Sequence, residues 1–146
     1  MDPKKFFSKT QQEEITSAIK EAEKNTSGEV RVHIEGTCNS DPKDRAVQVF
    51  KKLGMHKTDL KNGVLFYLAV QSKQFAVIGD KGINEKVEDN FWDSIKSTII
   101  NHFSNGEYTE GLKYGIIQTG EKLATHFPYM IDDINELSDD ISFGEK

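Results

Sequence analysis

A run of seven consecutive apolar residues, Val64 to Val70, constrains the fold more than any other feature of the chain. Its length suits one β-strand and falls far short of the roughly 20 residues that a membrane-spanning helix needs. Because the run has no polar alternation, it is typical of a strand that is buried on both faces. The sequence therefore predicts a central strand in a sheet with both sides covered.

A second strand is predicted at Glu29–Glu35, where three apolar residues alternate with four polar ones. Such alternation indicates one covered face and one solvated face, so we expect His33 and Glu35 to face solvent, where they would bind a metal only weakly. Asp41-Pro42 and Gly54 mark the two ends of a helix between the two strands. Because a helical crossover of this kind joins parallel strands, the two strands are predicted to be parallel.

A third strand, Phe75–Ile78, follows the central strand after a short polar link and predicts an antiparallel hairpin.

Three more helices are predicted. The first covers about 10–24, with Ser8 or a Thr10–Glu13 capping box at its start, the second begins after Asp89 as its cap, and the third covers about 107–127. The expected fold class is α/β: a three-layer α/β/α sandwich with a small mixed sheet of three to four strands and helices on both faces, in a single domain over 8–128.

The net charge of −5 comes from the last part of the chain. Residues 129–146 hold six acids and one lysine, whereas residues 1–128 are balanced. We expect this acidic tail to be weakly ordered or to form a short docked helix. Without an obvious basic cluster, no nucleic-acid partner is expected. The absence of a signal-peptide pattern predicts a cytoplasmic protein, which we expect to be monomeric, and the single Cys38 excludes an intramolecular disulfide.

The predicted topology brings three turn segments, 26–29, 59–63 and 79–82, to one edge of the sheet. The polar residues in and after these segments include Asp59, Asn62, Asp80, Glu85 and Asp89. Several oxygen ligands in one cleft suit a hard divalent cation such as Ca²⁺ or Mg²⁺. Converging carboxylates could instead act as general acid and base. The third interpretation is that these are ordinary turn residues at strand ends, where Asp, Asn and Gly are common.

Four phrases in this order resemble one known family: Thr26–Val32, Arg45–Phe50, Asn62–Leu65 and Ile78–Val87. Together they are similar to the TPM domain, the family of thylakoid-lumen acid phosphatases and their bacterial relatives, over about residues 8–127. Many members have Gly-x-Gly after the third strand, whereas this chain has the longer Gly79-Asp80-Lys81-Gly82. Many also carry a signal peptide and a C-terminal membrane helix, so this chain is expected to be a stand-alone soluble version.

The resemblance implies a divalent-metal site and a phosphatase activity, which gives two hypotheses. In the first, the metal ligands are Asp59, Asp80, Glu85 and Asp89, the catalytic residues are Asn62, Asp80 and Asp89, and the substrate is a phosphorylated small molecule. Lys81 or Arg45 would neutralise the phosphate. In the second hypothesis, the same edge belongs to a non-catalytic accessory module that binds a protein partner.

Overall fold

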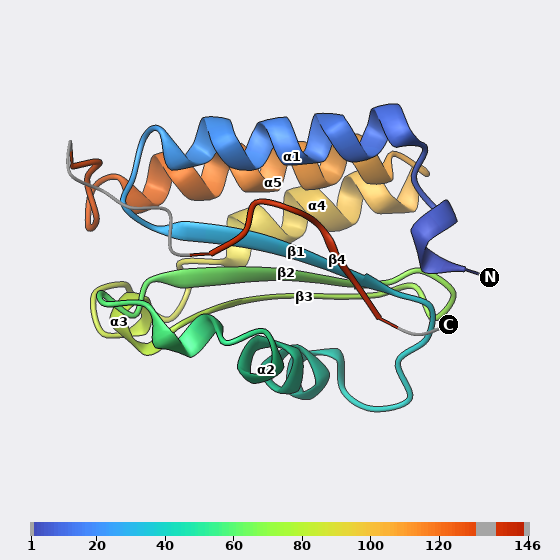
Figure 1. Cartoon of the computed structure of the whole chain (residues 1–146), viewed down its shortest axis with the longest axis horizontal. Helices are drawn as coiled ribbons and strands as arrows, with labels where there is room; N and C mark the ends of the chain where they lie inside the picture. Colours follow the sequence, from blue (N-terminus) through green and yellow to red (C-terminus); the bar gives the residue numbers. More distant parts are fainter. Residues whose placement is uncertain (1, 131–136, 145–146) are drawn as a thin grey trace.

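The computed structural model describes residues 2–130 and 137–144 and has three layers (Figure 1). The elements in chain order are η1 (Pro3–Lys5), α1 (Lys9–Glu23), β1 (Glu29–Glu35), α2 (Pro42–Lys52), η2 (Met55–Lys57), β2 (Gly63–Ala69), β3 (Gln74–Gly79), α3 (Lys81–Asn84), α4 (Asp93–Ser104), α5 (Tyr108–Leu123) and β4 (Ser142–Phe143). Helices α1, α4 and α5 cover one face of the sheet and α2 covers the other. The predicted α/β/α sandwich is therefore confirmed.

The sheet has the strand order β3-β2-β1-β4 in the described part of the chain. Strand β1 runs parallel to β2, with Glu29 opposite Gly63, and β2 runs antiparallel to β3, with Val64 opposite Gly79. The mixed sheet predicted from the helical crossover and the hairpin is confirmed by this pairing. Strand β4 adds a fourth, parallel strand beside β1.

Strand β2 divides the core in two, as its continuous apolar run predicts. Val64, Phe66 and Leu68 belong to the core beneath α1, α4 and α5, whereas Leu65 and Tyr67 belong to the core beneath α2. Alternate residues of a strand point to opposite faces, so an apolar residue is needed at every position. Helices α1 and α5 can approach closely because Gly120 has no side chain. A side-chain carbon at this position would lie only 2.9 Å from Ala22.

Two helix starts differ from the prediction. Helix α1 is capped by Ser8, whose Oγ accepts from the Gln11 amide at 3.1 Å while the Gln11 side chain accepts from the Ser8 amide at 2.9 Å. This reciprocal pair places Thr10 inside the helix, so the Thr10 capping box is wrong. Helix α4 begins only at Asp93, after a turn, and its N-cap is Trp92 without a side-chain hydrogen bond, so Asp89 is not a cap.

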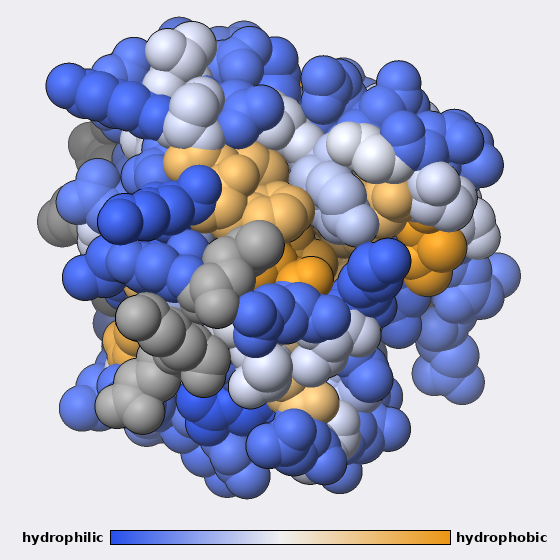
Figure 2. Space-filling view, turned by 90° about the vertical axis from the view of Figure 1, so that its right-hand side faces the viewer, coloured by the Kyte–Doolittle hydropathy of each residue, from blue (hydrophilic) through white to orange (hydrophobic). Residues whose placement is uncertain are grey.

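One end of the sandwich is closed by aromatic side chains. Phe6 packs edge-on against Phe7 and Tyr108, and Phe103 packs edge-on against Phe75, with ring centroids 4.9 to 5.4 Å apart. Figure 2 faces this end of the molecule and shows apolar surface near its centre, surrounded by hydrophilic residues. Several of the chain's phenylalanines thus cover the apolar core at this end of the molecule.

The acidic tail returns to the sheet. The Leu137 amide donates to Glu29 Oε1 at 2.7 Å, Ser142 and Phe143 pair with β1, and the Gly144 amide donates to the Ile34 carbonyl at 2.8 Å. Residues 137–144 therefore form an extended segment that ends in a strand, where the sequence suggested weak order or a docked helix. The portion 131–136 of that predicted helix lies outside the described residues. No helix in the described ranges has the length and apolar character to cross a membrane.

Candidate functional site

The three turn segments predicted to converge do meet at one edge of the sheet. The strand register sets Glu29 beside Gly63 and Val64 beside Gly79, and the Asp80 amide donates to the Gly63 carbonyl at 2.9 Å. The segments are adjacent because β1 and β2 both begin here and β3 ends here. The topology inferred from the sequence thus placed Asn62 and Asp80 in neighbouring segments.

Asp80 stands at the start of α3 and is half-buried. Its Oδ1 accepts from the Lys81 amide at 2.8 Å, while its buried Oδ2 has no hydrogen-bond partner among the described residues. Two neutral groups in the preceding loop are likewise buried and without partners in the described ranges, namely Asn62 Nδ2 and Thr58 Oγ1. A buried polar atom without a partner is costly, so this loop edge holds unused hydrogen-bonding or ligating capacity.

The loop and α3 are held tightly together. Gly82 lies against the Leu60 and Lys61 carbonyls, and a side-chain carbon at residue 82 would overlap both. Lys61 has a positive φ of 52° and its Nζ donates to the His56 carbonyl at 2.6 Å. The close approach at Gly82 therefore fixes the loop that carries Thr58 and Asn62 relative to the helix that follows Asp80.

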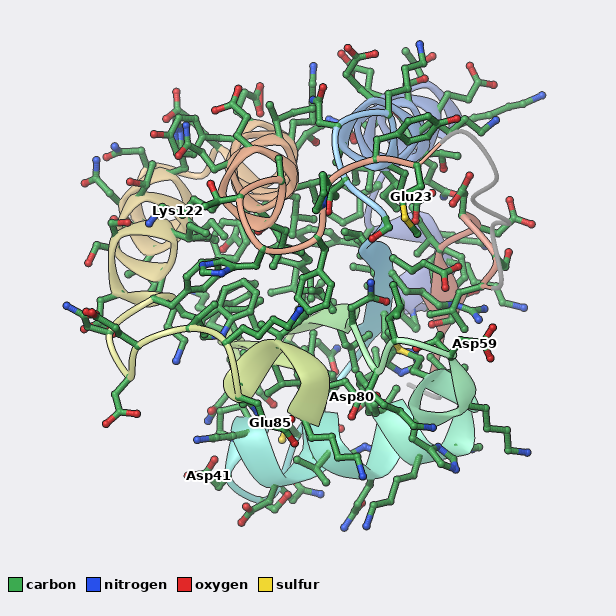
Figure 3. All side chains as sticks on the ribbon, turned by 90° about the vertical axis from the view of Figure 1, so that its left-hand side faces the viewer. Glu23, Asp41, Asp59, Asp80, Glu85 and Lys122 are labelled. Atoms are coloured by element: carbon green, nitrogen blue, oxygen red, sulfur yellow. The ribbon has the colours of Figure 1, made fainter. Side chains whose placement is uncertain are left out.

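The other predicted ligands do not gather around Asp80. Asp59, Glu85 and Asp89 are all exposed, and Figure 3 shows Asp59 and Glu85 on opposite sides of Asp80. Within residues 2–130 and 137–144, no three His, Cys, Asp or Glu side chains are grouped so that they could hold a metal ion. The structure thus leaves Asp80 as the one carboxylate of the predicted set that is partly buried.

A cavity of about 530 Å³ adjoins Asp80 along the outer strand β3. Its apolar wall includes Val47 and Phe50 of α2 and Trp92 before α4. Its charged lining is mixed and contains both lysines and acids, namely Lys43, Lys51, Lys81, Lys96, Asp80, Glu88, Asp89 and Asp93. We call this cavity the β3 cleft. It brings Asp80, Asp89 and Lys81 of the predicted site to one cavity.

The expectation that His33 and Glu35 face solvent is wrong, because both are buried, with exposed fractions of 5% and 3%. Glu35 accepts from Arg45 Nε at 2.9 Å and Nη2 at 3.1 Å, from His33 Nε2 at 3.1 Å, and from the Tyr67 hydroxyl. Arg45 is therefore committed to Glu35 and lies away from Asp80. His33 and Glu35 are covered by residues of α2, β2 and β4. The alternation of polar and apolar residues within β1 cannot reveal this burial.

The pKa values of this network follow from its hydrogen bonds. Burial raises the pKa of Glu35, but the hydrogen bonds from Arg45, Tyr67 and His33 outweigh burial, so the pKa lies below the ordinary value. Burial lowers the pKa of His33, despite the opposing effect of Glu35. At neutral pH, Glu35 is thus ionised and His33 is neutral. The Nε2–H of His33 donates to Glu35, and Nδ1 is left to interact with Ser142 Oγ at 2.8 Å.

The fold and the site together define a small α/β/α sandwich domain with a cleft beside the outer strand of its sheet. The chain belongs to the TPM domain family, whose model matches residues 1–122. The family resemblance seen in the sequence is confirmed. No protein with curated function matches the chain.

Solved structures of similar fold include proteins from three bacteria. The NMR structure of BA42 protein from the psychrophilic Bizionia argentinensis is 48% identical, with a TM-score of 0.91 over 96% of this chain and 97% of that one. The N-terminal domain of a protein from P. gingivalis is 20% identical, with a TM-score of 0.67 over 84% of this chain and 80% of that one. The N-terminal domain of a Corynebacterium glutamicum protein is 14% identical, with a TM-score of 0.61 over 93% and 80%. The last two carry information on fold alone.

Proposed function

We propose that this TPM domain binds a divalent cation, Ca²⁺ or Mg²⁺, at Asp80 and a phosphorylated small molecule in the β3 cleft. The observation that carries the proposal is the buried Asp80 Oδ2, which has no hydrogen-bond partner among the described residues. A carboxylate oxygen in this position is stabilised by a cation, and carboxylate, amide and hydroxyl groups are the ligand types that hard cations take. The two unpartnered oxygens, Asp80 Oδ2 and Thr58 Oγ1, therefore fit such an ion, whereas Asn62 Nδ2 is a hydrogen-bond donor that would position a ligand or water beside it.

The donor set predicts a weak site. The set Asp80, Asn62 and Thr58 contains one carboxylate, and Ca²⁺ affinity depends on the number of charged ligands and on the rigidity of the site, so we expect a dissociation constant on the order of 0.1–1 mM. Asp89 lines the same cleft and is the next ligand that we propose. Asp59 and Glu85 are exposed and would have to turn towards Asp80 to contribute.

The cleft also supports the phosphate part of the proposal. When bound, a divalent cation polarises a phosphoryl oxygen and can orient water for phosphomonoester hydrolysis. Lys81 follows Asp80 directly, and Lys43 lines the same cleft, so both can neutralise phosphate charge. Arg45 is not part of this site, because Glu35 holds its guanidinium at the opposite end of the sheet from Asp80.

The test is a titration with CaCl₂ and MgCl₂, followed by amide chemical shifts, on the wild type, Asp80→Asn and Asp44→Asn. Asp44 is an exposed acid on α2 and serves as the matched control. We expect saturating shifts around residues 58–63 and 80–82 that vanish in D80N and persist in D44N. Equal responses in both variants would contradict the cation site. Absence of p-nitrophenyl phosphate hydrolysis with either ion, or with Mn²⁺, would remove the enzymatic half.

A second candidate, a non-catalytic module that binds a protein, is favoured by the apolar wall of the cleft. Val47 is 40% exposed there, and β3 is the last strand on its side of the described sheet. An extended peptide can add to such an edge through backbone hydrogen bonds and place apolar side chains in the adjoining groove. Binding of this kind would survive EDTA and D80N, whereas the cation-dependent function would not.

A further inference from the structure

A second cavity, of about 750 Å³, lies at the C-terminal end of β1, at the opposite end of the sheet from Asp80. Its floor is the His33–Glu35–Arg45 network, and its sides come from the loop 37–40, the end of α2 and the tail strand. We call it the β1-end cavity. Of the residues predicted to form the Asp80 site, only Arg45, a candidate to neutralise the phosphate, lines this cavity, so its chemistry must be derived separately.

The carboxylate in this cavity is unavailable to a cation. Each oxygen of Glu35 already accepts from two donors: Oε1 from His33 and Arg45, and Oε2 from Arg45 and Tyr67. Gly144 also lies directly over the His33–Glu35 pair, because a side-chain carbon there would overlap Glu35 Oε1. A metal ion would have to displace these donors, so the cavity offers no carboxylate oxygen for coordination.

Positive charge remains after Glu35 is satisfied. Among the described residues, the lining contains the three cations Lys4, Arg45 and Lys52 and the one carboxylate Glu35, an excess of two positive charges in a protein whose overall charge is negative. His33 adds no charge at neutral pH, because its pKa is lowered by burial. The balance therefore favours an anion with two charges over one with a single charge.

The hydrogen-bond donors are partly prearranged. Arg45 has five N–H groups, of which the described residues occupy three, two by Glu35 and one by Gln48 at 3.2 Å. Glu35 thus holds the guanidinium plane in place, while two N–H groups remain for a ligand. Ser40, Thr37 and Asn39 add hydroxyl and amide groups to the same lining. Fixed guanidinium donors beside hydroxyl groups suit the oxygens of an oxyanion.

We propose that the β1-end cavity binds a doubly charged oxyanion, with phosphate as the representative group. The site is independent of the cation site at Asp80. The ligand would accept from the free N–H groups of Arg45 and be neutralised by Lys4 and Lys52. Glu35 is a positioning residue in this proposal, because it orients Arg45 and does not touch the ligand.

The experiment is a titration of the wild-type chain at pH 7.5 with sodium phosphate, sodium sulfate and sodium acetate at constant ionic strength, followed by amide and Arg Nε chemical shifts. We expect saturable shifts at Arg45 and at residues 37–40 with phosphate and sulfate, and at least several-fold weaker binding of acetate. Lys52→Gln should weaken phosphate binding about two- to fivefold, as expected for one exposed charge. The matched control Lys57→Gln, an exposed lysine outside the lining, should leave it unchanged.

The proposal would be overturned by no saturation with either dianion, by equal affinity for acetate and phosphate, or by equal effects of K52Q and K57Q. Because both lysines are exposed, neither substitution threatens the fold. The same titration on Asp80→Asn separates the two sites. If D80N abolishes cation binding and leaves phosphate shifts at Arg45 intact, the phosphate is bound in the β1-end cavity and not at Asp80. Phosphate shifts confined to residues 79–82 would refute the second site.

Discussion

Replacing Glu35 by glutamine should destabilise the protein strongly, although the shape of the side chain barely changes. Glu35 is 3% exposed, and its two oxygens accept four hydrogen bonds. A glutamine keeps one oxygen and presents an NH₂ group in place of the other. Whichever way the amide turns, two donors lose their acceptor, and one of them is a group of Arg45.

The size of the effect follows from which donors are lost. Arg45 is 31% exposed at its side chain and can turn to water, which limits its share. The second lost donor is His33 or Tyr67, both buried, and leaving such a group unpaired costs about 1–3 kcal/mol. Together with the lost charge-assisted bonds of Arg45, we expect a loss of about 3 kcal/mol, or about 9 °C in Tm for a chain of this size.

Urea denaturation of wild type and E35Q at pH 7 and pH 3 measures this effect. Because hydrogen bonds keep the folded pKa of Glu35 below its ordinary value, the stability that it provides is present above the unfolded pKa of 4.5 and is lost as pH falls through the folded pKa. The difference between the two proteins should therefore shrink at pH 3. The control Glu14→Gln, which breaks an exposed ion pair with Lys113, should cost less than about 1 kcal/mol. A loss of 1 kcal/mol or less in E35Q would refute the reasoning.

Three further predictions concern other parts of the fold. Ser8→Ala should cost about 1 kcal/mol of unfolding free energy, and Thr10→Ala less than half as much, because only Ser8 caps α1; the reverse order in urea denaturation would contradict the assigned cap. Gly82→Ala should cost about 1–3 kcal/mol through overlap with the loop carbonyls, and an unchanged Tm would disprove that close contact. Burial, reinforced by the nearby Asp139, raises the pKa of Glu23 to about 9, so the folded state keeps a proton that the unfolded state releases near 4.5. The wild type should therefore lose stability relative to Glu23→Gln as pH rises from 5 to 9, and a constant difference across urea melts at pH 5, 7 and 9 would exclude that shift.

The strands were predictable because each has a local pattern. The predicted strand 29–35 has the observed bounds of β1, and the other two predicted strands lie within one residue of β2 and β3 at each end. Their arrangement followed from the chain between them, since a helix separates β1 from β2 and a short polar link separates β2 from β3. The same topology placed Asn62 and Asp80 in neighbouring segments without any knowledge of their side-chain directions.

The parts that escaped prediction depend on contacts between distant segments. The alternation in β1 marks His33 and Glu35 as polar, but it cannot reveal that Arg45, Tyr67 and the tail cover them. The exposed positions of Asp59, Glu85 and Asp89 depend on how the loops leave the sheet, which residue types alone do not determine. The topology therefore predicted correctly which segments meet at the sheet edge, but it could not predict which acidic side chains in those segments lie close enough to share a ligand.

The pairing of β4 with β1 also bears on the order of folding. His33 and its partner Ser142 are separated by 109 residues, whereas β2 and β3 are joined by a short hairpin. Closing so long a loop is slow compared with forming a hairpin, so we expect β4 to dock last. During synthesis on the ribosome, the outer edge of β1 would thus stay open until Ser142 and Phe143 have emerged. In that interval the unpaired edge of β1 can form hydrogen bonds with strands of other chains, which promotes aggregation. Pairing with β4 then covers this edge.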